Sequence, residues 1–147
     1  MQSAQYDAQY YHNCCGPLPY SRDYPQWYAM FSQHADIIHR TLGPETVYDA
    51  GCASGIFVEA LRDRGINASG GDISPYAISQ VPDRLRAYCR LWSLATPIDH
   101  TYDLITCIEV LEHLTEPEVE GAIQNLCGAT DTILFSASPD DYSELNS

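Results

Sequence analysis

The apolar residues of this chain recur at two different spacings. From Pro25 onward, apolar side chains follow one another at intervals of three and four, which places them on one face of a helix that Gly43-Pro44 ends; they are Trp27, Phe31, Ala35, Ile38 and Leu42. Short apolar runs then alternate with helical stretches. The pattern predicts strands over 46–50, 66–71, 87–91, 102–108 and 132–137, and helices over 56–64, 75–80 and 116–126.

This alternation of strands and helices predicts the fold class. Short βα units with buried, β-branched strands form parallel sheets that carry helices on both faces and right-handed crossovers. We therefore expect an α/β protein with a Rossmann-like, doubly wound, mainly parallel sheet. Residues 1–24 are rich in Tyr and Pro and show no sustained period, so they are predicted to form an irregular lid or tail on a core spanning 25–147.

Composition and charge narrow the class of protein. A chain of 147 residues that is 45% hydrophobic can bury one core, which favours a single globular domain. Seven basic and 20 acidic residues give a net charge of −13, which disfavours nucleic acid as a partner. The chain has neither a signal-peptide core nor an apolar stretch of membrane length, so we expect no membrane association and a cytoplasmic location. The six cysteines lack zinc-site spacing and are expected to be free thiols, with the pair Cys14 and Cys15 unexplained.

A loop of small residues follows the first predicted strand. Gly51 and Gly55 allow positive φ and a close approach of a ligand to the backbone, and the next helix offers unpaired N–H groups. A tight turn without a ligand is the alternative.

Asp72 ends the second predicted strand. Its carboxylate there can accept both hydroxyls of a ribose or cap the helix that begins at Pro75. The spacing from loop to acid also fits a dinucleotide such as NAD.

Three segments resemble a known family. The first, Asp49 to Gly55, resembles the first motif of class I S-adenosylmethionine (SAM)-dependent methyltransferases, whereas the G-x-G-x-x-G fingerprint of NAD enzymes is absent. The stretch from Tyr102 to Leu114 is similar to the fourth-strand motif of that family, and Ile133 to Pro139 is similar to its fifth strand. The resemblance covers roughly residues 25 to 140. It implies strand order 3-2-1-4-5, with the final strand pair of the family missing.

The resemblance also implies a cofactor site for SAM and its product S-adenosylhomocysteine. Asp49 would anchor the methionine moiety, and Asp72 would bind the ribose. Ser93 stands where the family usually has an acid or amide near the adenine; the neighbouring Trp92 is equally explained by core packing. The expected cofactor-binding residues are Asp49, Gly51, Cys52, Ala53, Gly55, Asp72, Ile73, Ser93 and Glu109. Ala53 replaces a glycine that is more frequent in the family.

The run Glu109-x-x-Glu112-His113 provides the candidate catalytic residues. It lies just beyond the carboxyl end of a predicted strand, where such folds bind substrates. His113 is suited to act as a general base because its pKa is close to neutral. The pattern also resembles metal-using O-methyltransferases of small-RNA 3′ ends and of ubiquinone biosynthesis. No histidine follows His113, so we predict no metal site and treat a divalent cation, or a capping role for Glu112 and His113, as alternatives.

The favoured function is methyl transfer from SAM to a small-molecule or sugar acceptor, with oxygen as the expected methylated atom. The main alternative is a non-catalytic module that binds SAM or a partner. A metal-dependent RNA 2′-O-methyltransferase and an NAD-dependent oxidoreductase are less favoured than either of these two functions.

We further expect aromatic and basic residues near the N-terminus to close over the cofactor, namely Tyr11, His12, Tyr20 and Arg22. A second copy or a partner chain is expected to cover the exposed sheet edge.

Overall fold

The computed structural model describes residues 3–138, which form a mixed α/β domain. The helices are α1 (Ala8–Asn13), α2 (Pro25–Thr41), α3 (Ile56–Arg62), α4 (Pro75–Ser79) and α5 (Glu116–Cys127), with 3-10 helices η1 (Ser3–Gln5), η2 (Asp83–Tyr88) and η3 (Leu111–His113). The strands are β1 (Thr46–Ala50), β2 (Asn67–Asp72), β3 (Cys89–Leu91), β4 (Leu104–Ile108) and β5 (Ile133–Ser136). All neighbouring strands pair in parallel, in the order β3-β2-β1-β4-β5. The predicted fold class and strand order are confirmed.

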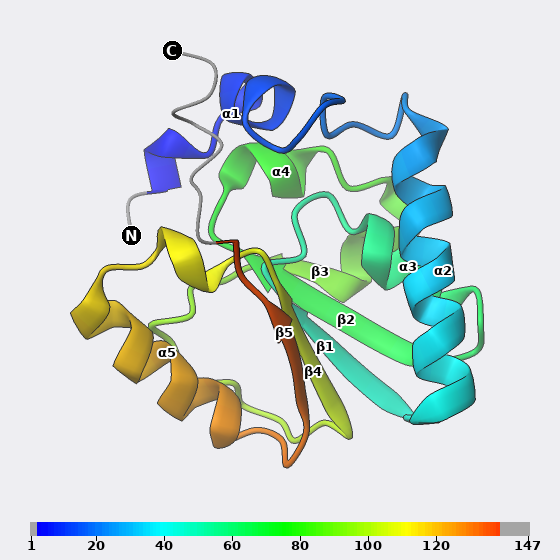
Figure 1. Ribbon diagram of the computed structural model, residues 1–147, viewed down its shortest axis with the longest axis vertical. Helices are drawn as coiled ribbons and strands as arrows, with labels where there is room; N and C mark the ends of the chain where they lie inside the picture. Colours follow the sequence, from blue (N-terminus) through cyan, green and yellow to red (C-terminus); the bar gives the residue numbers. More distant parts are fainter. Residues whose placement is uncertain (1–2, 139–147) are drawn as a thin grey trace.

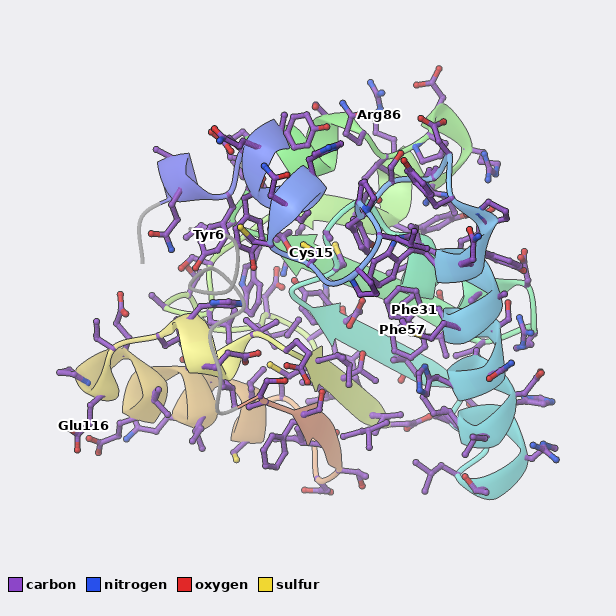
Figure 2. All side chains as sticks on the ribbon, turned by 45° about the horizontal axis from the view of Figure 1, so that its top comes forward. Tyr6, Cys15, Phe31, Phe57, Arg86 and Glu116 are labelled. Atoms are coloured by element: carbon purple, nitrogen blue, oxygen red, sulfur yellow. The ribbon has the colours of Figure 1, made fainter. Side chains whose placement is uncertain are left out.

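Helices cover both faces of the sheet and bury a hydrophobic core on each. Helices α2 and α3 pack on one face and α5 packs on the other (Figure 1). Phe31 of α2 stacks on Phe57 of α3 with ring centroids 5.1 Å apart, which joins the two helices (Figure 2). On the opposite face, Tyr48, Ile105 and Leu126 are almost fully buried between the sheet and α5.

The parallel register gathers the ends of β1, β2 and β4 at one edge of the sheet. Asp49 of β1 lies opposite Gly70 of β2 and Thr106 of β4. A Cβ atom on Gly70 would come within 2.6 Å of Cys52 Cβ, so the loop after β1 rests directly against β2. Helices α1 and α4 lie above this edge (Figure 1). The chain therefore places its glycine-containing loop beneath its own N-terminal segment.

The predicted apolar face of α2 is largely correct but ends one turn early. Ala35 and Ile38 are buried, Phe31 is half-buried against them, and the half-buried Trp27 ring stacks on Phe31. Leu42 is 55% exposed, contrary to the prediction. It is the C-cap residue of α2, and the chain turns away at Gly43, whose φ is +54°.

The N-terminal segment contains two short helices that the pattern did not predict, η1 and α1; Asp7 caps α1 by accepting a hydrogen bond from the Tyr10 N–H at 3.0 Å. The third strand starts two residues later than predicted, because Ala87 and Tyr88 belong to η2, which starts after Pro82. All the predicted bounds agree with the structure within two residues. None of the described helices is long and apolar enough to span a membrane.

Candidate functional site

The loop between β1 and α3 is held in one strained conformation. Gly51 and Gly55 have φ of +89° and +79°, and Ala53 has φ of +48°, which is unusual for a residue with a side chain. A Cβ atom on Gly51 would overlap the Val110 side chain. The N–H groups of Gly51 and Cys52 donate to the Gly71 carbonyl at 2.8 and 3.0 Å. The loop is thus fixed against the ends of β2 and β4, as a preformed ligand site requires.

Asp72 connects this loop to the start of α4. Its side chain is only 8% exposed; Oδ2 accepts from the Ala53 N–H at 2.8 Å and Oδ1 accepts from the Ser74 N–H at 2.9 Å. Burial raises the pKa of this carboxyl group. Each carboxylate oxygen keeps a second lone pair, so both can also accept a hydroxyl of a ligand. The N-cap of α4, which was the alternative role for Asp72, is Ser74, whose Oγ accepts from the Ala77 N–H at 3.0 Å.

Asp49 lies beneath the loop. It is 4% exposed and accepts a hydrogen bond from Thr106 Oγ1 at 2.8 Å. Burial raises its pKa to about 7, and the nearby Asp72 adds to the shift. A cationic group bound above the loop would favour the charged form of Asp49. The buried Thr106 was missed by sequence reasoning, although a lone polar residue in the apolar run of β4 is a signal that could have found it.

The far end of the site contains Trp92 and Ser93. Trp92 packs edge-on against Tyr48 with centroids 5.3 Å apart, so its predicted packing role is confirmed. Its Nε1 is buried and has no hydrogen-bond partner within residues 3–138. Ser93 Oγ accepts from the Ala95 N–H at 3.2 Å, closing a turn. Trp92 therefore has an unsatisfied donor inside the core cluster that packs against α5.

Glu109 and Glu112 form a carboxyl pair at the end of β4. Glu109 has φ of +54°, a strained conformation of the kind that collects at functional sites, and its Oε1 accepts from Ser136 Oγ at 2.9 Å. Glu112 Oε2 is buried and has no hydrogen-bond partner within residues 3–138. Burial, followed by the interaction with the Glu109 carboxyl group, raises the pKa of Glu112 to about 7. The pair can therefore hold one proton near neutral pH. The cap of α5 is Thr115 rather than Glu112 or His113.

His113 faces the N-terminal segment. Its Nε2 lies 3.2 Å from the hydroxyl oxygen of Tyr10, and the rings of Tyr6 and Tyr10 meet it edge-on. Among residues 3–138, no group of three or more His, Cys, Asp and Glu side chains is arranged to hold a metal. Sequence reasoning did not single out Tyr10 as a site residue, because its partner is 103 positions away in the chain.

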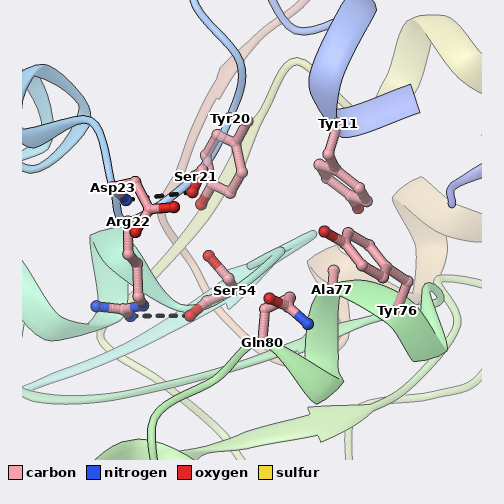
Figure 3. A pocket seen from close by; sticks show the side chains of 9 residues that line it. All are labelled: Tyr11, Tyr20, Ser21, Arg22, Asp23, Ser54, Tyr76, Ala77 and Gln80. Atoms are coloured by element: carbon pink, nitrogen blue, oxygen red, sulfur yellow. Dashed lines mark hydrogen bonds between the residues drawn. The ribbon is translucent and has the colours of Figure 1, made fainter. Parts of the chain in front are cut away.

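Aromatic residues of the N-terminal segment cover the loop. Tyr11 and Tyr20 belong to one apolar cluster with Ala53, Ile73 and Tyr76. A cavity of about 120 Å³ remains beside them (Figure 3), lined by residues that include Arg22, Ser54 and Gln80 but by none of the predicted cofactor-binding residues. The aromatic side chains thus cover the loop, and the lid role of Tyr11 and Tyr20 stays a prediction.

The two other predicted lid residues lie differently. His12 is exposed on the surface of α1. Arg22 forms an ion pair with Glu59 and donates to the Ser54 carbonyl at 2.9 Å (Figure 3). Arg22 thereby fastens the end of the N-terminal segment to the start of α3, beside the glycine-containing loop.

This geometry can be compared with known proteins. The sequence profile of the methyltransferase domain family matches residues 26–145, which is most of the chain. The chain belongs to this methyltransferase family. The match confirms the resemblance to class I methyltransferases that the loop and strand motifs indicated.

Relatives of this methyltransferase domain include a ubiquinone biosynthesis O-methyltransferase of Methylococcus capsulatus. The two are 32% identical over 107 residues, which cover 67% of this chain and 45% of the relative. This chain therefore spans less than half the length of that relative.

Two solved structures share the fold. A SAM-bound amino pentose methyltransferase of Micromonospora echinaspora is 19% identical, with a TM-score of 0.66 over 76% of this chain and 51% of its own. A magnesium protoporphyrin IX methyltransferase of Synechocystis with bound SAM is 22% identical, with a TM-score of 0.63 over 78% of this chain and 59% of its own.

Proposed function

We propose that this methyltransferase domain binds SAM above the β1–α3 loop and transfers its methyl group to an oxygen atom of a small-molecule or sugar acceptor. The observation that carries the proposal is the buried carboxylate of Asp72, which bridges the loop and α4 at the carboxyl end of β2. In doubly wound folds this is the place where an acidic residue binds the ribose of a nucleotide ligand.

The residues around Asp72 fit each part of the proposed cofactor. Asp49 is buried beneath the loop, and a positively charged amino group of the methionine moiety would lower its raised pKa and favour the carboxylate. The glycines of the loop let that moiety approach the backbone. The remaining predicted contacts, namely Cys52, Ile73, Ser93 and Glu109, border the same edge of the sheet.

When bound, SAM would supply an electrophilic methyl group, so the chain must mainly orient the acceptor and remove its proton. His113 is the proposed proton acceptor, because a neutral imidazole can take a proton from a hydroxyl group near neutral pH. Glu109 and Glu112, which share a proton at the end of β4, would accept hydrogen bonds from acceptor hydroxyls. The aromatic residues of the N-terminal segment would exclude water from the reacting atoms.

The acceptor class is proposed from the relatives and from the charge. The Methylococcus relative is named an O-methyltransferase of ubiquinone biosynthesis, and the structural neighbour from Micromonospora acts on an amino pentose. A net charge of −13 repels polyanions such as RNA. A small acceptor that carries hydroxyl groups is consistent with both observations.

A second candidate function is a module that binds SAM or a partner without catalysing transfer. The aligned part covers 45% of the Methylococcus relative, so the transferase activity of that relative is only a proposal for this chain, and a binding role is the alternative to test. Turnover of SAM with any acceptor would exclude this alternative.

The proposed cofactor is tested by calorimetric titration of the purified chain with S-adenosylhomocysteine. We expect micromolar affinity, and an Asp72→Ala variant that binds at least about fivefold more weakly because it loses charge-assisted hydrogen bonds. Asp72→Asn keeps an acceptor oxygen for Ala53 and should lie between the two. Asp99→Ala removes an exposed carboxylate paired with Arg90 and should bind like the wild type.

The outcomes of this titration are distinct. Absence of binding by a folded wild-type chain would refute the cofactor assignment. Binding that Asp72→Ala leaves unchanged would refute the ribose contact while keeping the cofactor. If binding is found, a screen of phenolic, hydroxylated and amino-sugar acceptors with radiolabelled SAM tests the transfer itself.

A further inference from the structure

Tyr10 links the N-terminal segment to the proposed proton acceptor. The Tyr10 hydroxyl lies 3.2 Å from His113 Nε2, and the two rings meet edge-on with centroids 6.0 Å apart. Tyr6 packs edge-on against both rings, at 4.9 Å from Tyr10 and 5.9 Å from His113 (Figure 2). The imidazole is thus enclosed by two tyrosines that come from a different part of the chain.

The same segment is also attached at the Asp72 side of the site. Ser74 Oγ donates to the Tyr6 carbonyl at 2.5 Å, and Ser74 is the cap of α4 that also donates its N–H to Asp72. On the other side of α1, the Tyr11 ring lies 5.9 Å from the Tyr76 ring of α4. Residues 6–11 therefore span the site from the proposed ribose contact to the proposed base.

We propose that Tyr10 is a positioning residue that holds the His113 imidazole in place when α1 closes over the site, so that closing the site and orienting the base are one event. This inference rests on the proposed function, because it assigns the orientation of the proton acceptor in that same site. The hydrogen bond with Tyr10 fixes which ring nitrogen of His113 carries the proton.

Two further observations support this role. Burial raises the pKa of Tyr10 well above its ordinary value, so the phenol stays neutral, and its oxygen can accept a hydrogen bond from the Nε2–H of His113, which assigns proton acceptance to Nδ1. Tyr6, Tyr10 and Tyr11 lie in one apolar cluster with Ala53 of the β1–α3 loop, so a ligand that binds above this loop displaces them. The contact between α1 and His113 is therefore expected to break and re-form as α1 moves.

The experiment compares the wild type with Tyr10→Phe, which removes one oxygen and keeps the ring packed against Tyr6. Ring ¹⁵N chemical shifts of labelled histidine, recorded at pH 8, report the tautomer of each imidazole, and His113→Gln identifies the His113 signals. We expect the His113 ring signals of Tyr10→Phe to move towards a mixture of tautomers. Tyr28→Phe loses a comparable hydroxyl on α2, bonded to Asp63, and should leave them unchanged.

Amide hydrogen exchange of residues 8–13 and titration with S-adenosylhomocysteine complete the test. Loss of one hydrogen bond should speed exchange in α1 about fivefold in Tyr10→Phe, with no change in α5. Unchanged His113 ring signals would overturn the positioning role, whatever the exchange rates. Altered signals in a chain that does not bind S-adenosylhomocysteine would instead refute the proposed function and leave the contact between Tyr10 and His113 established.

Discussion

Gly51 shows how much one residue constrains the proposed site. Its φ of +89° disfavours any side chain, and a Cβ atom there would overlap Val110 at the end of β4. We expect Gly51→Ala to lower the free energy of unfolding by about 1–3 kcal/mol, measured by urea denaturation, and to abolish binding of S-adenosylhomocysteine.

The matched control for this prediction is Gly121→Ala. Gly121 lies inside α5, and no atom would meet its added Cβ within 4 Å. Alanine is the better helix former, so this variant should be more stable than the wild type by about 0.5–1 kcal/mol. If the two alanine variants unfold at the same urea concentration, the strain assigned to Gly51 is wrong.

Asp49 should make stability depend on pH. Its pKa is about 7 in the folded chain, against roughly 3.9 in an unfolded one, so the folded state binds the extra proton between these values. The contribution of Asp49 to stability is therefore complete below about pH 3.9, is lost as the pH rises from there through 7, and changes little above that value. Between pH 5 and 8 we expect the wild type to lose on the order of 2 kcal/mol more than Asp49→Asn.

Urea denaturation of both proteins across this pH range measures the effect. Glu112, whose pKa is also raised, contributes equally to both proteins and cancels in the difference. Asp131→Asn changes an exposed carboxylate and should follow the wild-type curve. Parallel curves for wild type and Asp49→Asn would show that Asp49 is ionised in the folded state.

At the scale of elements, α5 depends on its first turn. Thr115 accepts a hydrogen bond from the backbone of Glu118, and the Glu118 side chain accepts from the Thr115 N–H at 2.8 Å, which is a complete capping box. We expect Thr115→Ala to lower the free energy of unfolding by about 1 kcal/mol. Thermal or urea unfolding measures this, and Thr115→Ser, which keeps the hydroxyl, should restore most of it. Equal losses in both variants would exclude the cap as the cause.

The elements themselves differ in how well the sequence indicates them. Helix α2 and strands β1 and β4 have long, regular apolar patterns and were predicted within two residues. Helix α1 has only six residues, so its own pattern is too short to show a period. Its one local signal is the cap at Asp7.

For the whole molecule, β5 is one of the two edge strands of the sheet. Within residues 3–138 it pairs with β4 and with no other strand, and Phe135 is 61% exposed. An edge strand with an exposed aromatic ring is a surface on which another strand can pair, and its cover by a second copy or partner chain stays a prediction.

The sequence by itself determined the parallel α/β architecture, the loop after β1 and the acid that ends β2. These depend on local spacing, because apolar periodicity selects helix or strand and glycine marks positions of positive φ. The predicted positions of Gly51 and Asp72 at the same sheet edge followed from parallel strand order alone.

Only the tertiary structure decided which side chains meet across the site. The contact of Tyr10 with His113 and that of Asp49 with Thr106 join residues 103 and 57 positions apart. Such contacts arise from the packing of α1 and from the register of β1 against β4, which depend on the whole fold. The shift of the Asp49 pKa has the same origin, since it results from burial rather than from neighbours in sequence.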